Sequence, residues 1–124
     1  MDSSISVLIV EDEPVTAMGL QTRLKIQGHN VLGIAVTGEE AFQIAKSHQP
    51  DIVLLDVSLA GKASGIDVAK RIRSQMPDVE FAFLTASDDP MIHKEIEQLN
   101  PVAVLKKPLN LQHTIHLHGR AFSM

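Results

Sequence analysis

The segment VLIVEDEP, residues 7–14, joins four apolar residues to three consecutive acidic ones. The apolar run is typical of a strand covered on both faces, and Pro14 fits the first turn of a helix. Glu11, Asp12 and Glu13 stand at the junction. Because crowded like charges repel one another unless a positive group lies among them, the junction is either a solvated turn or a cation site.

Five short apolar runs of this kind alternate with segments of helical period. The runs are SVLIV (6–10), NVLGIAV (30–36), DIVLLD (51–56), VEFAFL (79–84) and VAVL (102–105). Helices are expected near 14–27, 38–48, 65–76 and 89–99, with a last one from about residue 109. This alternation predicts an α/β fold, a doubly wound sandwich with a parallel sheet and right-handed crossovers.

Several helix boundaries carry their own signals. Gly28 follows the first expected helix as a stop, and Thr37 with Glu40 fits a capping box. Asp88 is expected to cap the helix that has Pro90 in its first turn.

Composition limits the classes of function. The chain has 124 residues, 44% hydrophobic and 21% charged, and contains no linker, so we expect one globular domain over residues 1–124. A net charge of −4 argues against direct nucleic-acid binding, and the absence of cysteine excludes disulfides and thiolate chemistry. No apolar run approaches the ~20 residues that span a membrane, and MDSSISV is not a signal peptide, so a cytoplasmic location is expected.

Chemically useful residues follow four of the five expected strands. In an open α/β sheet the site forms beyond the carboxyl ends of the strands. Three carboxylates, one hydroxyl and one ammonium should therefore meet at one edge: Glu11, Asp12, Asp56, Thr85 and one lysine of the pair Lys106 and Lys107. Converging carboxylates suit Mg²⁺, and Asp56, being already ionised, could attack phosphorus without a general base. Metal and lysine would offset charge on the phosphoryl oxygens.

Four motifs carry a family resemblance: VLIVEDEP, DIVLLDVSL, FLTAS and VLKKPL, in this order. Together they resemble the receiver domain of two-component response regulators, to about residue 110. The resemblance implies a five-stranded parallel sheet of flavodoxin-like order 2-1-3-4-5, built as (βα)5. It also implies a switch that takes a phosphoryl group from a histidine kinase or phosphotransfer protein, and not an enzyme with external turnover.

The same resemblance implies a role for each site residue. Asp56 would be the phosphoacceptor, Thr85 the switch hydroxyl, and Lys107 the phosphoryl-binding cation in a cis peptide bond with Pro108. Mg²⁺ would be bound by Asp12 and Asp56 directly, by Glu11 through water, and by the backbone carbonyl of Ser58. A homodimer would use the face made by the fourth helix, fifth strand and fifth helix.

The chain departs from the common receiver pattern in three places. Ala60 replaces a proline four residues after the phosphoacceptor, and the loop LAGKASG is one residue longer than usual. Val104 stands where many receivers have a Tyr or Phe that turns inward on activation. The segment NLQHTIHLHGRAFSM makes a poor final helix, since it is rich in histidine and broken by Gly119.

Other interpretations of single residues stay open. Glu13 is either a solvated charge at a helix start or a site residue, and Lys106 is the alternative to Lys107. Ser87, two residues past Thr85, either tunes the access of water to the acyl phosphate or only starts a helix. The histidines of the last segment are either surface residues or a structural metal site: His113, His116 and His118.

Three other functions compete with the receiver. A haloacid-dehalogenase-like phosphatase would place a second aspartate where Ser58 stands, and a flavin-binding domain would not have an acidic EDEP loop. A pseudo-receiver would keep the fold only as an interaction module. The chain is either complete or the N-terminal part of a longer protein, since receivers commonly precede DNA-binding or enzymatic domains.

Overall fold

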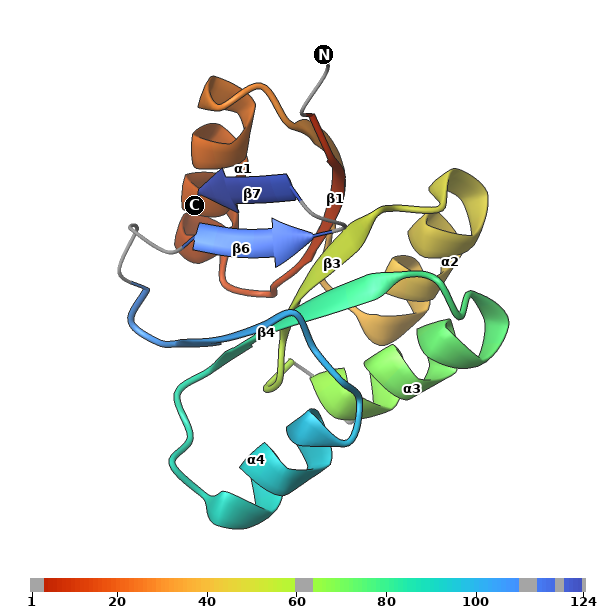
Figure 1. Cartoon of the computed structure of the whole chain (residues 1–124), viewed down its shortest axis with the longest axis vertical. Coiled ribbons are helices and arrows are strands. Elements are labelled where there is room, and N and C mark those ends of the chain that lie inside the picture. The colour runs from red at the N-terminus through yellow and green to blue at the C-terminus, as the bar shows by residue number, and fades with distance from the viewer. Residues whose placement is uncertain (1–3, 60–63, 110–113, 118–119, 124) are drawn as a thin grey trace.

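A computed structural model of the chain describes residues 4–59, 64–109, 114–117 and 120–123 (Figure 1). Its elements, in chain order, are β1 (Ser6–Val10), α1 (Pro14–Ile26), β2 (Asn30–Ala35), α2 (Gly38–His48), β3 (Ile52–Asp56), α3 (Gly65–Gln75), β4 (Glu80–Thr85), α4 (Pro90–Glu97), β5 (Ala103–Lys106), β6 (Thr114–Leu117) and β7 (Arg120–Ser123). None of the described helices is long and apolar enough to cross a membrane.

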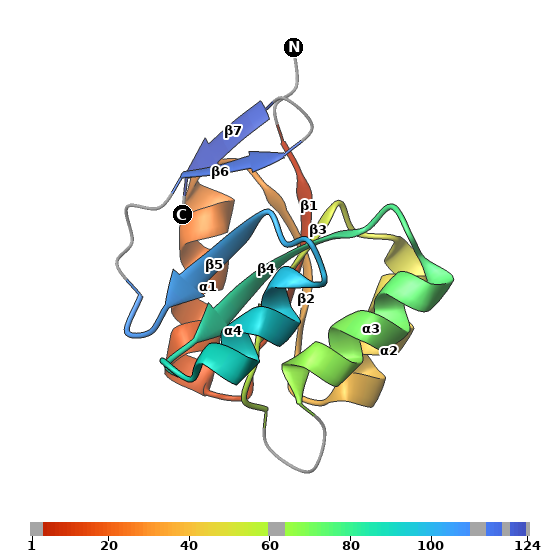
Figure 2. The same cartoon turned by 60° about the horizontal axis from the view of Figure 1, so that its bottom comes forward.

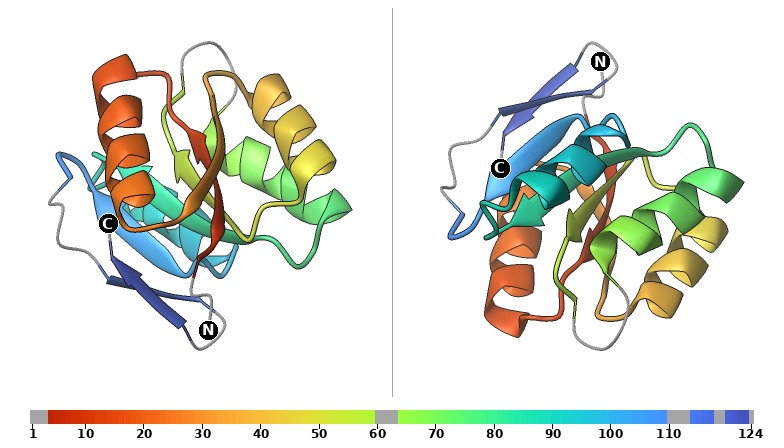
Figure 3. Two further views of the ribbon diagram at one scale, coloured as in Figure 1. Left: turned by 90° about the horizontal axis from the view of Figure 1, so that it is seen from above. Right: turned by 90° about the horizontal axis from the view of Figure 1, so that it is seen from below.

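The first five strands form one parallel sheet in the order β2-β1-β3-β4-β5, as predicted. Helices cover both faces of this sheet, with α1 on one side and α2, α3 and α4 on the other (Figures 2 and 3). The central strands are apolar except at their ends, because alternate residues enter two different cores. In β3, Val53 and Leu55 pack on the side of α2 and α3, whereas Ile52 and Leu54 pack on the side of α1.

The helices begin close to the predicted positions. The Glu13 side chain caps α1 by accepting a hydrogen bond from Val15 N at 3.0 Å, and Thr37 caps α2. Gly28 follows α1 with φ +86°, a conformation that favours glycine. The predicted cap of α4 is wrong by one residue: Asp89 accepts from Met91 N, while Asp88 pairs with Lys106.

The predicted fifth helix is wrong. Residues 114–117 and 120–123 form an antiparallel hairpin, in which Thr114 is opposite Ser123 and Leu117 opposite Arg120. In the segment TIHLHG, residues 114–119, polar and apolar residues alternate and a glycine follows, which suits a hairpin better than a helix. Over the described residues, the fold therefore has five parallel strands, four helices and the two-stranded hairpin, not (βα)5.

The hairpin takes part in the core on the α1 side of the sheet. Leu117 is 1% exposed and packs in the cluster that contains Ile5, Leu24 and Leu105. Figures 2 and 3 show the hairpin near the end of the sheet where β1 starts. The apolar surface that a last helix was expected to cover is thus partly covered by β6.

Candidate functional site

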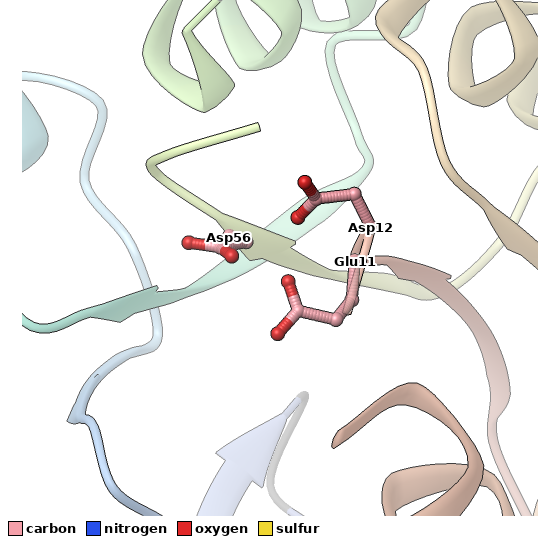
Figure 4. Close-up of side chains that lie close together, drawn as sticks. All are labelled: Glu11, Asp12 and Asp56. Carbon is pink, nitrogen blue, oxygen red and sulfur yellow. The ribbon is translucent and has the colours of Figure 1, made fainter. Parts of the chain in front are cut away.

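The parallel topology brings the expected acidic residues together. Glu11 and Asp12 directly follow β1, and Asp56 is the last residue of β3, the strand that neighbours β1. One carboxylate oxygen from each of the three lies within 4.8 Å of the others. Figure 4 shows the three side chains pointing toward one another beyond the strand ends.

Lys107 lies between two of these carboxylates. Its Nζ donates to Glu11 Oε1 at 2.6 Å and to Asp56 Oδ2 at 2.7 Å. The Lys107–Pro108 bond is cis, as the family resemblance implied, and Lys107 N donates to the Thr85 carbonyl at 2.8 Å. Lys106 instead forms an ion pair with Asp88, and its side chain is 67% exposed. Lys107 is therefore the lysine of the site.

Glu11 is the most strongly perturbed group in this cluster. Its side chain is fully buried, and burial together with a hydrogen bond to Asp56 raises its pKa to about 7, although Lys107 opposes the shift. The pKa of Lys107 is raised: burial lowers it, but its hydrogen bonds to Asp56 and Glu11 outweigh this. Glu11 Oε2 is buried without a hydrogen-bond partner. An unpaired buried oxygen beside two other carboxylates is a group that a cation or its water would satisfy.

Asp56 is held from two sides. Its Oδ1 accepts from Ser58 N at 3.0 Å and its Oδ2 from Lys107, so both oxygens are oriented. Behind it, Gly65 N donates to the Val57 carbonyl at 2.8 Å. A Cβ added to Gly65 would lie 2.0 Å from the Asp56 carbonyl oxygen. The start of α3 therefore approaches β3 at a distance that only glycine permits, which the sequence alone did not reveal.

Thr85 completes the site from the end of β4. It is buried, and its Oγ1 accepts from Ser87 N at 3.0 Å. Asp56, Ser58, Thr85, Ser87 and Lys107 all line one cleft of about 450 Å³. Asp56, Thr85 and Lys107 thus border the same cleft. Glu11 and Asp12 join them through their contacts with Asp56 and Lys107.

The donor set fits Mg²⁺. Mg²⁺ prefers oxygen ligands and is usually held by one or two carboxylates with several waters, and here three carboxylates converge. Among the described residues, this is the one group of three acidic or histidine side chains close enough to share an ion. The role of the Ser58 carbonyl as a further ligand stays a prediction.

Of the residues at which the chain departs from the common pattern, Val104 is described and does not line this cleft. Val104, in β5 opposite Phe83, is 39% exposed. Ala60 and the middle of the LAGKASG loop lie outside the described residues, as do His113 and His118. His116 is exposed in β6. The structure thus places none of the proposed histidine cluster in a described site.

Comparisons with known proteins agree with this geometry. The family model of the response regulator receiver domain matches residues 7–117. The phyllosphere-induced regulator PhyR of Methylorubrum extorquens is 35% identical over 86% of this chain and 39% of its own length. The signal receiver domain of a modulated diguanylate cyclase from Desulfovibrio desulfuricans G20 has a TM-score of 0.79 and 34% identity, with 86% of this chain and 84% of that one covered.

A third relative extends the same picture. The transcriptional regulatory protein PdtaR of Mycobacterium tuberculosis is 33% identical over 88% of this chain and 52% of its own length. The chain spans less than half the length of PhyR and of several other curated relatives that it matches. The solved structure from Desulfovibrio desulfuricans is described as an example of alternate folding.

Proposed function

The chain belongs to the response regulator receiver domain family, a family of non-enzymatic signalling domains of two-component systems, and on that premise we propose that Asp56 is its phosphoacceptor. A histidine kinase or a histidine phosphotransfer protein would be the donor, and the domain would meet such a partner in the cytoplasm. The observation that carries the proposal is the position of Lys107. Its ammonium forms ion pairs with both Asp56 and Glu11 at the edge of the cleft.

The proposed transfer needs little rearrangement of Asp56. A carboxylate oxygen forms a bond to phosphorus as the bond from phosphorus to the donor nitrogen breaks, and an ionised carboxylate needs no base for this step. The Ser58 N–H holds Oδ1, so Oδ2, which accepts from Lys107 Nζ, would be the attacking oxygen. The Ser58 N–H would therefore contribute to the transfer by positioning the Asp56 carboxylate.

Lys107 and Thr85 would stabilise the phosphorylated state. The Lys107 ammonium is already beside Asp56 and would offset charge on the transferred phosphoryl oxygens. Because Thr85 Oγ1 accepts from Ser87 N, its own proton is free to be donated to one of those oxygens. A Mg²⁺ ion held by Glu11, Asp12 and Asp56 would supply further positive charge at the same place.

Treatment with acetyl phosphate tests the proposal. Intact-mass measurement should show one phosphoryl adduct on the parent protein with Mg²⁺ present and none with EDTA. The adduct should disappear in Asp56→Asn and persist in the matched control Asp78→Asn, since Asp78 is an exposed residue that precedes β4 at the opposite edge of the sheet. An adduct that persists in Asp56→Asn would refute the assignment, and a parent protein that takes no phosphoryl group would be a pseudo-receiver.

A further inference from the structure

The loop between β4 and α4 is ordered by a repeating pattern of side-chain to backbone hydrogen bonds. Ser87 N donates to Thr85 Oγ1 at 3.0 Å, and Asp89 N donates to Ser87 Oγ at 3.0 Å. Met91 N donates to Asp89 Oδ1 at 2.9 Å. Each bond spans two residues, so the loop follows a single path from the site threonine to the first turn of α4.

His93 fastens this loop to α4 at two points. Its backbone N–H donates to the Asp89 carbonyl at 3.1 Å, as a helix residue does. Its imidazole Nε2 lies 2.8 Å from the Ser87 carbonyl oxygen. A carbonyl oxygen can only accept, so Nε2 carries the proton and donates. The contact spans six residues and is shielded, since both His93 and Ser87 are only half-exposed.

The other described side-chain link from this loop is weaker. Asp88 pairs with Lys106 of β5 at 2.6 Å, but their side chains are 80% and 67% exposed. Exposed ion pairs contribute little, because water screens them and both long side chains lose freedom. Two hydrogen bonds thus tie Ser87 to α4: one from Asp89 N at the cap, and the half-buried one from the His93 side chain, which reaches past the first residues of the helix.

Ser87 connects the site with this histidine. Its N–H holds the hydroxyl oxygen of Thr85, and its C=O is held by His93. If the Thr85 hydroxyl moves toward the cleft, it therefore pulls on the N–H of Ser87. The carbonyl of Ser87 then passes this movement to His93 in α4. In many receivers an aromatic residue of the fifth strand follows the threonine, but here that position is the exposed Val104.

We propose that His93 is a positioning residue: it sets the place of the Thr85 hydroxyl through Ser87 and carries its displacement to α4. The inference rests on the proposed function of Asp56 and Thr85, and adds a route to α4 that needs no aromatic residue in β5.

Two variants separate the hydrogen bond from a merely structural role. In His93→Gln the amide nitrogen is as many bonds from Cα as Nε2 of histidine, so it can reach the Ser87 carbonyl. In His93→Asn the amide nitrogen is one bond shorter and cannot reach. Histidine and asparagine have similar helix propensities, so the Asn variant tests reach and not helix stability.

Backbone NMR measures how far the change at the site reaches. Spectra are recorded with and without Mg²⁺ and beryllofluoride, and beryllofluoride mimics the phosphoryl group. In the parent and in His93→Gln, amide shifts should appear both at Thr85–Ser87 and along α4. In His93→Asn, shifts should remain around Asp56 and Thr85 but be lost along α4. In the free protein, the Ser87 and Asp89 amides of His93→Asn should also exchange faster with solvent than those of His93→Gln.

The outcomes distinguish the two proposals. If His93→Asn shows the same α4 shifts as the parent, or if His93→Gln loses them as well, the role of His93 is wrong while the proposed function stands. If the parent shows no response to beryllofluoride at Asp56 and Thr85, the proposed function fails and the inference fails with it.

Discussion

Glu11 makes the stability of the metal-free protein depend on pH. Its pKa is about 7 in the folded chain, against an ordinary value of 4.5 that we take for the unfolded chain. Between these values the folded state keeps a proton that the unfolded state has released. The free energy of unfolding should therefore fall as the pH rises from about 4.5 to about 7 and then level off. Because each unit of the pKa difference is worth about 1.4 kcal/mol, the expected loss is on the order of 3 kcal/mol.

Urea unfolding in EDTA, repeated between about pH 5 and pH 8, measures this loss. Glu11→Gln cannot titrate at this position and should lose less stability over the same range. The assignment would be contradicted if the parent and Glu11→Gln showed the same pH dependence.

Asp12 should control the response to Mg²⁺. A cation that binds only the folded state stabilises it by mass action, by about 1.4 kcal/mol at ten times Kd, and so raises the melting temperature. Asp12→Ala should abolish this shift, and its metal-free form should be no less stable than the parent because one repelling charge is gone. The matched control is Glu13→Ala, which loses the cap of α1 but should keep the shift. An unchanged shift in Asp12→Ala would show that Asp12 is not a ligand.

Gly65 should tolerate no side chain. Its added Cβ would lie 2.0 Å from the Asp56 carbonyl oxygen, which is backbone and cannot turn away. We expect Gly65→Ala to lower the free energy of unfolding by about 2 kcal/mol or more and to slow phosphorylation, because α3 must move from β3. The control is Gly19→Ala in α1, where nothing lies within 4 Å and where alanine should stabilise the helix by about 1 kcal/mol. Equal stabilities of the two variants would contradict this reading of the close approach.

At the scale of elements, periodicity predicted the parallel sheet well and the last segment badly. Strands buried on both faces appear as continuous apolar runs, so five of them could be located from sequence, and four helices lay between them. The alternating pattern of the fold predicts a helix for the last segment. Its alternation of apolar and polar residues around Ile115 and Leu117 already favoured strands, and the structure has β6 and β7.

The hairpin should contribute to stability through Leu117. This residue is 1% exposed in the core on the α1 side, so Leu117→Ala should lower the free energy of unfolding by about 2–4 kcal/mol. His116, exposed in the same strand, provides the control, and His116→Ala should change stability by less than about 0.5 kcal/mol. Urea denaturation of both variants decides the matter. A Leu117→Ala protein as stable as the parent would mean that the hairpin does not pack on the sheet.

At the scale of the whole molecule, topology explains why most of the site could be predicted. Parallel strands end at one edge, so residues after β1, β3, β4 and β5 meet there whatever the details of the loops. Contacts that depend on loop paths could not be predicted. The bond from His93 to Ser87 and the approach of Gly65 to Asp56 leave no periodic signal in the sequence.

The predicted dimer face must also be corrected. It was expected to combine the fourth helix, fifth strand and fifth helix, but the described chain has a hairpin in place of the fifth helix. What remains of that face is α4 with β5, including the exposed Met91 and Val104. A partner that senses phosphorylation there would depend on how far α4 moves. With valine in place of an aromatic residue, we expect a coupling of about 1–2 kcal/mol, at the low end of the usual range.

Chemical trapping identifies the phosphorylated residue most directly. Borohydride reduces an aspartyl phosphate to homoserine and leaves free carboxylates unchanged, so peptide mass mapping locates the modified position. After incubation with acetyl phosphate and Mg²⁺, we expect homoserine in place of Asp56 and unmodified Asp12 and Asp51. Omission of Mg²⁺ should leave Asp56 intact. Conversion of another carboxylate, or an intact protein that carries a phosphoryl group while Asp56 remains aspartate, would contradict the assignment of Asp56 as the phosphoacceptor.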